Sequence, residues 1–115
     1  MITESTKHLF EKPKEAVNPK FNNIGEVLRD ERLTHFLDKR ISHISFKRSH
    51  IPEGTRLKRS PVDFLEECGW LNSKDLISLY IGIVGKKTNL PSVVRSYITE
   101  IVRQSIIETI KFYEN

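Results

Sequence analysis

Positive charge is concentrated in one part of the sequence, residues 39–59. Its cations are Lys39, Arg40, Lys47, Arg48, Arg56, Lys58 and Arg59. Glu53 is the single carboxylate among them, so this segment has a net charge of +6, whereas the rest of the chain contributes −2 to the overall +4. His43 and His50 add positive charge at lower pH. Such a segment attracts phosphates or acidic protein surfaces, and arginine suits phosphate because it binds bidentately.

Two functions fit this charge, and a third interpretation assigns no binding function to it. The first is binding of DNA or RNA through the phosphate backbone by the seven cations, with Lys86 and Lys87 as additional contacts. The second is a helical protein-interaction module, an adaptor, inhibitor or assembly subunit whose basic loop meets an acidic partner. The third is a solvated loop that neutralises the acidic remainder. Ile44, Phe46 and Leu57 lie among the cations and could hold the loop against the core, which favours a function; nucleic-acid binding is our leading expectation.

A helix-turn-helix would be a more specific form of this function. A helix from Ser73, a turn, and a helix that opens with Ser92 and Arg95 have the right order for such a motif. The turn of about six residues is longer than the usual three or four, and the second helix is apolar on much of its surface. The sequence therefore favours contacts to the backbone over this motif.

The remaining chemistry-bearing residues do not form a recognisable catalytic or metal site. Gly85-Lys86 resembles part of a phosphate-binding loop, but Tyr80 and Lys87 stand where that pattern needs a glycine and a hydroxyl. Cys68 has no histidine close in sequence and is expected to be buried as a small hydrophobe. The four histidines lack metal-ligand spacing, and the paired carboxylates are adjacent residues, which point in different directions on a helix. We expect no enzyme activity, no metal and no cofactor.

The composition indicates one domain in an intracellular setting. The chain has 115 residues, of which 37% are hydrophobic and 30% charged. Its one cysteine excludes an internal disulfide framework. The longest nearly apolar run, residues 76–84, is half of the roughly 18 residues that a membrane span needs, and the first residues have no apolar segment of the kind that directs export. We expect a cytoplasmic protein without membrane contact.

The pattern of apolar residues predicts an all-α fold of four or five helices. Residues 1–20 are expected to be a flexible arm, residues 21–115 a single helical domain, and residues 39–59 its basic connector. Ile24 and Val27 lie on one helical face and Leu33 and Leu37 on a different one, so either a bend lies across residues 29–32 or one helix is buried on two sides in succession. Residues 41–48 fit either a helix or a short strand, and residues 49–60 are expected to be a loop.

Capping residues predict a tight corner between two helices. Ser60 followed by Pro61 is typical of a helix start, and Gly69 is typical of a helix end. Asn72 offers the next N-cap, for a helix over residues 73–85 that is apolar over more than half of its circumference and is expected to be central. Trp70 lies between the two helices, so we expect its side chain to be largely buried there.

The last helix, from about residue 92 to residue 112, has two apolar stripes. The first stripe consists of Val94, Tyr97 and Ile101. The other short elements of a small domain can cover this stripe easily. The second stripe consists of Val102, Ile106, Ile110 and Tyr113. Because covering both stripes is harder, the second is expected to be an interface for a homodimer or for a partner's helix. The alternative is that the N-terminal arm folds back over it.

Overall fold

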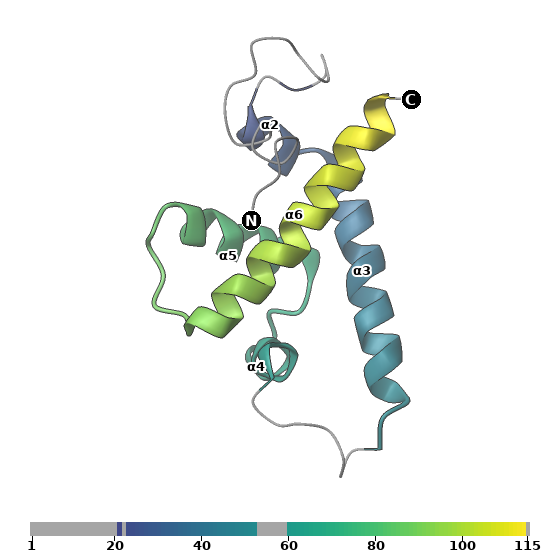
Figure 1. The fold of residues 1–115 in the computed structure, drawn as a ribbon, viewed down its shortest axis with the longest axis vertical. Helices are drawn as coiled ribbons and strands as arrows, with labels where there is room; N and C mark the ends of the chain where they lie inside the picture. The colour runs from purple at the N-terminus through teal and green to yellow at the C-terminus, as the bar shows by residue number, and fades with distance from the viewer. Residues whose placement is uncertain (1–20, 22, 53–59, 115) are drawn as a thin grey trace.

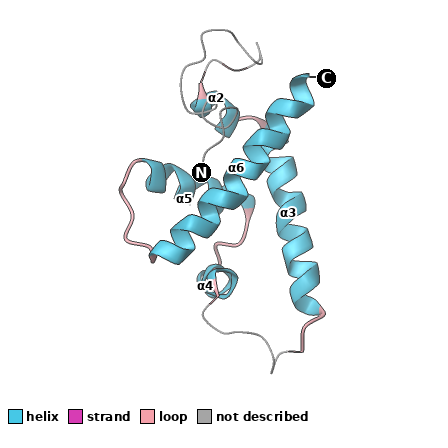
Figure 2. Cartoon of the chain, in the orientation of Figure 1, coloured by secondary structure: helices cyan, strands magenta, loops and turns pink. Residues whose placement is uncertain are grey.

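The computed structural model describes residues 21, 23–52 and 60–114, and within them the fold is all-α. Its helices are α2 (Ile24–Leu28), α3 (Glu31–Ser49), α4 (Pro61–Cys68), α5 (Ser73–Val84) and α6 (Ser92–Glu114) (Figure 2). The prediction of a small all-α domain is confirmed at this level. The arm expected over residues 1–20 and the stretch 53–59 of the basic connector lie outside the described residues.

Helix α6 is the centre of the fold. It crosses the molecule diagonally, with α3 along one side, α5 along the other and α4 near its first half (Figure 1), and it contacts each of these helices as well as α2. Its buried face runs through Val94, Ile98, Val102 and Ile106. The expectation that residues 73–85 form the central helix is wrong, because α5 leaves Ile81 and the end of the helix exposed.

The change of apolar face near residue 30 is a break between two helices. Helix α2 ends at Leu28, and Asp30 caps the start of α3 by accepting a hydrogen bond from the Arg32 amide at 2.8 Å. Asp30 is also held by the far end of the chain, since the Tyr113 hydroxyl donates to its carboxylate oxygens at 3.0 and 3.1 Å. The bend therefore brings the start of α3 against the end of α6.

The predicted corner between α4 and α5 is present. The Asp63 amide donates to the Ser60 hydroxyl at 3.1 Å, and the amides of Gly69 and Trp70 close the helix end on carbonyls of its last turn. Gly69 has φ +74°, the left-handed conformation that this ending requires. The Asn72 side chain then caps α5, again as predicted. Trp70 is only partly buried, packed against the core rather than enclosed in it.

The connection from α5 to α6 contains the one left-handed non-glycine residue among those described. Lys86 has φ +56°, and the next amide, of Lys87, donates to the Gly82 carbonyl at 2.8 Å. This is the pattern with which α4 ends at Gly69, but here a lysine occupies the position that favours glycine. The conformational cost falls on Lys86, while Gly85 before it has ordinary φ.

The second stripe of the last helix is part of the chain's own core, which corrects our expectation of an interface there. Val102 and Ile106 are fully buried, and Ile110 and Tyr113 are partly buried against the same core. The reason is that the start of α3 packs beside the end of α6, where Asp30, Phe36 and Arg40 contact Tyr113, Phe112 and Glu108 respectively. Because these four side chains face the chain itself, we do not propose them as a homodimer contact.

Candidate nucleic-acid interface

The first half of the basic segment is helical rather than a connector. Residues 39–49 form the second half of α3, and His50 is its C-cap. Residues 39–52 contain no carboxylate. The open choice over residues 41–48 is therefore settled as helix, and the helical turn now decides which cations face inward and which face solvent.

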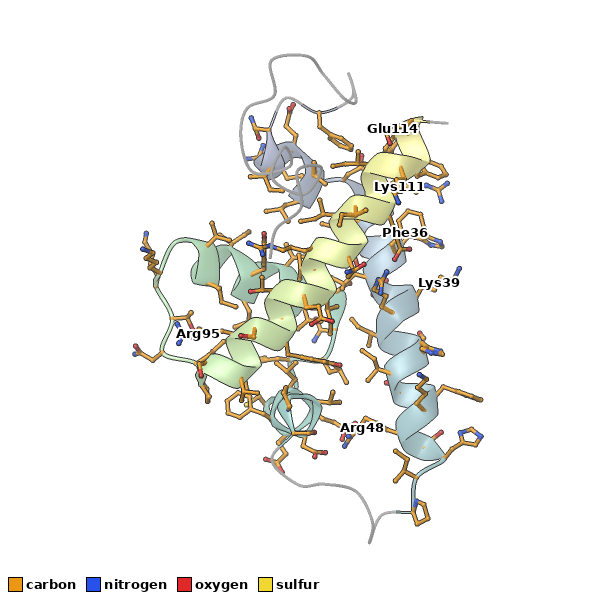
Figure 3. All side chains as sticks on the ribbon, in the orientation of Figure 1. Phe36, Lys39, Arg48, Arg95, Lys111 and Glu114 are labelled. Carbon is orange, nitrogen blue, oxygen red and sulfur yellow. The ribbon has the colours of Figure 1, made fainter. Side chains whose placement is uncertain are left out.

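Arg48 faces inward, toward α4. Its guanidinium pairs with the Asp63 carboxylate and lies 3.3 Å from a Glu66 oxygen. The side chains of Arg48 and Asp63 are only 14% and 16% exposed. In Figure 3, Arg48 extends from the end of α3 toward α4. The sequence predicted that Arg48 contacts phosphate, but in the fold it joins two helices.

The environment of this pair shifts both pKa values. Burial acts to lower the pKa of Arg48, but hydrogen bonds and charges from Asp63 and Glu66 together raise it. The pKa of Asp63 lies below its ordinary value, first because the Ser60 hydroxyl donates to it at 2.9 Å and second because Arg48 does. Asp63 therefore stays ionised. Its carboxylate binds both the Ser60 hydroxyl at the start of α4 and the Arg48 guanidinium of α3.

Arg40 also faces inward, toward α6. It pairs with the carboxylate of Glu108, and each of the two side chains is about one third exposed, at 35% and 36%. This pair lies at the surface between α3 and α6. Arg40, which the sequence placed among the phosphate contacts, is therefore also engaged within the fold.

The other side of α3 presents a face without any carboxylate, which we call the outer face. It consists of Lys39, His43, Phe46, Lys47 and His50, all of them exposed. The spacings of four, three and four residues from Lys39 to His43, Phe46 and His50 keep them on one side of the helix. Lys39 and His50 are ~16 Å apart along the helix axis at 1.5 Å per residue. In Figure 3, Lys39 projects away from α6.

Of the three residues expected to anchor the basic segment to the core, Ile44 does so, Leu57 lies outside the described residues, and the expectation is wrong for Phe46. Its side chain is 62% exposed. The His50 ring lies against it, with ring centroids 4.3 Å apart and planes at 49°. His50 Nδ1 donates to the Phe46 carbonyl at 2.8 Å, and the Ser49 hydroxyl donates to the same carbonyl at 2.7 Å. The two rings are therefore held together at the end of α3.

The remaining predicted cations do not join this face. Lys86 and Lys87 are exposed on the α5–α6 connection. In Figure 1 that connection is at the left edge and α3 at the right, across a molecule whose principal extents are 51 × 31 × 24 Å. The other three predicted contacts, Arg56, Lys58 and Arg59, lie outside the described residues. Of the predicted cations that face solvent, the structure thus places Lys39 and Lys47 on the outer face of α3 and a second lysine pair, Lys86 and Lys87, on the α5–α6 connection.

Phe46 as an exposed ring is the feature that sequence reasoning missed. Its signal was present, because Lys39, His43, Phe46 and His50 recur at helical spacing. Finding it required extending the helix beyond Ile41, where the alternation of Ile44 and Phe46 also fitted a strand. Once the helix continues to Ser49, Ile44 turns inward and Phe46 outward.

The remaining features to consider are Cys68, possible metal sites and possible membrane spans. Cys68 is exposed in the last turn of α4, which corrects the expectation that it is buried. Within residues 21, 23–52 and 60–114, no group of three or more histidine, cysteine or carboxylate side chains could hold a metal ion. Over the same residues, every helix is too short or too polar to cross a membrane.

Comparison of the chain with models of protein families, with curated proteins and with solved structures finds no match. We therefore infer a function from the geometry and the charge of the outer face of α3.

Proposed function

We propose that this chain is a non-enzymatic protein that binds nucleic acid through the phosphate backbone, with the outer face of α3 as its main surface. The observation that supports this most strongly is the sorting of charge around α3. Arg40 and Arg48 are paired with carboxylates of α6 and α4, whereas Lys39 and Lys47 face solvent together with two histidines, and α3 carries no carboxylate after the exposed Asp38 that precedes Lys39. An exposed surface of one sign attracts a polyanion because released counterions favour its binding.

The proposed contacts differ from those that the sequence predicted. Lys39 and Lys47 are the described phosphate contacts, and Arg56, Lys58 and Arg59 follow in the chain after the end of α3. Arg40 and Arg48 act as structural links instead. Two lysines and a short basic stretch suit contacts to phosphate without reading of base edges, so we expect little dependence on sequence.

A matched pair of double variants tests this proposal. Lys39→Gln with Lys47→Gln removes two charges from the outer face, and Lys74→Gln with Lys111→Gln removes two from exposed positions on α5 and α6. Fluorescence anisotropy with labelled single-stranded DNA, duplex DNA and RNA at about 50 mM salt measures binding. We expect the first variant to bind at least one of these more weakly and the second to bind like the wild type.

Two results would contradict the proposal. One is the absence of binding of all three nucleic acids by the wild type at this salt concentration. The other is an equal loss of affinity in the two double variants, because it would show that net charge rather than the outer face determines binding. A third variant, Lys86→Gln with Lys87→Gln, establishes whether the second lysine pair contributes.

A separate surface favours the alternative, a protein-interaction module. Ile81 and Val84 at the end of α5 and Val93 at the start of α6 are each more than half exposed, beside Lys86 and Lys87. Exposed aliphatic side chains with adjacent cations suit an acidic protein partner. Capture of a protein that survives nuclease treatment and is lost on Ile81→Asp would support this alternative.

A further inference from the structure

The outer face of α3 contains an aromatic ring that packing does not explain. Phe46 is 62% exposed, the highest value among the exposed large hydrophobic residues. Its neighbours on the face are lysines and histidines, and the next exposed apolar residue, Ile51, comes after the helix has ended. A lone ring among cations differs from the apolar centre of a protein interface, where charged residues are depleted.

The ring of Phe46 already has one aromatic neighbour at the end of α3. The His50 ring lies against it at 4.3 Å, and its own hydrogen bond to the Phe46 carbonyl holds that ring in place. The Ser49 hydroxyl shares the same carbonyl. Because His50 is held by the helix end itself, its ring loses little conformational freedom when a flat group packs on Phe46.

We propose that Phe46 is a stacking platform for an unpaired base, so that the nucleic acid bound by α3 is single-stranded. This inference rests on the proposed function, because the same strand supplies the phosphates that Lys39 and Lys47 contact. Along the helix axis these lysines are ~10 Å and ~2 Å from Phe46. Lys39 lies on the same side of α3 as Phe46, whereas Lys47, the next residue along the chain, is turned about 100° from the ring, so a strand stacked on Phe46 has to follow the helix surface to reach Lys47.

The chemistry of the face favours a single strand over a duplex. In a duplex the bases are stacked on one another and present only their edges in the grooves, whereas an unpaired base offers its flat face to an aromatic side chain. Stacking of this kind depends little on base identity, since every base has such a face. It therefore fits a surface whose other contacts are phosphate contacts.

Three probes of equal length separate stacking from charge. They are an oligothymidylate of about 15 nucleotides, an abasic strand with the same phosphates, and a duplex of about 15 base pairs, a length near the site size of single-strand binders. Anisotropy is measured for the wild type and for Phe46→Ala, Phe46→Trp and Ile81→Ala. The last variant removes an exposed apolar side chain on α5 and is the control.

We expect the wild type to prefer the oligothymidylate over both other probes. Phe46→Ala should weaken that affinity by about 5- to 150-fold, the range expected for loss of one stacked base, and should leave the affinity for the abasic strand unchanged. Phe46→Trp should restore binding, and its indole fluorescence should be quenched by the oligothymidylate more than by the abasic strand. Ile81→Ala should behave as the wild type.

Other results would overturn the inference in distinguishable ways. Equal affinity for the oligothymidylate and the abasic strand, unchanged by Phe46→Ala, would disprove stacking and leave the proposed function intact. A preference for the duplex would likewise exclude the single strand. If Phe46→Ala abolishes capture of a protein but not of the oligothymidylate, the ring belongs to a protein interface. Absence of binding to all probes would end both proposals.

Discussion

The guanidinium of Arg48 is paired with the carboxylate of Asp63, across the contact between α3 and α4. Asp63 is also the third residue after the N-cap of α4, where its amide and its carboxylate both hydrogen-bond the Ser60 hydroxyl. One carboxylate thus orders the start of α4 and attaches it to α3. The consequence for function is that Arg48, one of the predicted phosphate ligands of the basic segment, is occupied within the fold.

Replacing Arg48 is therefore expected to affect stability more than binding. Arg48→Gln should lower the free energy of unfolding by about 1–2 kcal/mol, because it leaves a partly buried carboxylate without its charged partner. Lys47→Gln, one residue earlier and exposed, should change stability by less than about 0.5 kcal/mol. Urea unfolding measures both. Equal stability of the two variants would show that the pair contributes nothing.

Acid should weaken this link. The pKa of Asp63 is lower in the folded chain than its ordinary value near 3.8. A carboxyl whose folded pKa is depressed stabilises the fold above its unfolded pKa, and this stabilisation is lost as the pH falls through the folded value. Asp63→Asn should therefore be less stable than the wild type near neutral pH, and the difference should shrink below about pH 4. Thermal midpoints that keep a constant difference down to about pH 2 would contradict this.

Lys86 adopts a backbone conformation that favours glycine. Lys86→Gly should stabilise the fold by about 0.5–1 kcal/mol, because glycine removes the cost of the left-handed conformation at the end of α5. Gly69→Ala is the converse substitution, because it introduces a side chain at the corresponding left-handed position at the end of α4. A Cβ there would contact nothing within 4 Å, so its expected destabilisation of about 1 kcal/mol reflects φ alone. A stabilising Gly69→Ala or a destabilising Lys86→Gly, measured by urea unfolding, would contradict the assignment of strain.

The stripe through Ile106 should behave as core. Ile106→Glu places a charge at a fully buried position against α3 and should prevent folding or lower stability by more than about 4 kcal/mol. Gln104→Glu, on the exposed side of α6, should fold normally. Circular dichroism with thermal unfolding tests both. A folded Ile106→Glu variant would mean that the stripe is free, as the sequence had led us to expect.

Local signals predicted local structure well. Ser60, Gly69 and Asn72 act through hydrogen bonds within four residues of themselves, and all three helix ends are where the sequence placed them. The break before Asp30 was readable for the same reason, since it changes the face on which apolar residues lie. Such features depend on few atoms and little on the rest of the chain.

Features set by contacts distant in sequence were not predictable. Whether Ile106 faces solvent depends on how the other helices pack around α6, which the stripe alone does not show. Whether Phe46 faces solvent depends on how far α3 extends, and the pattern after Ile41 fitted two structures. Whether Arg48 is free depends on Asp63, 15 residues later, and Arg40 depends on Glu108. Charge on a segment of sequence therefore suggested a class of ligand, which stays a prediction, but it did not show which cations remain exposed to bind one.

Binding by the outer face of α3 is tested most directly by its salt dependence. The slope of log K against log salt is measured for a single-stranded oligonucleotide with the wild type and with the Lys39→Gln, Lys47→Gln double variant. Each phosphate contact on a single strand contributes about 0.7 to this slope, so we predict that the variant's slope is shallower by about 1.4. An unchanged slope, with Lys39 and Lys47 both replaced, would contradict the proposal that these lysines contact phosphate.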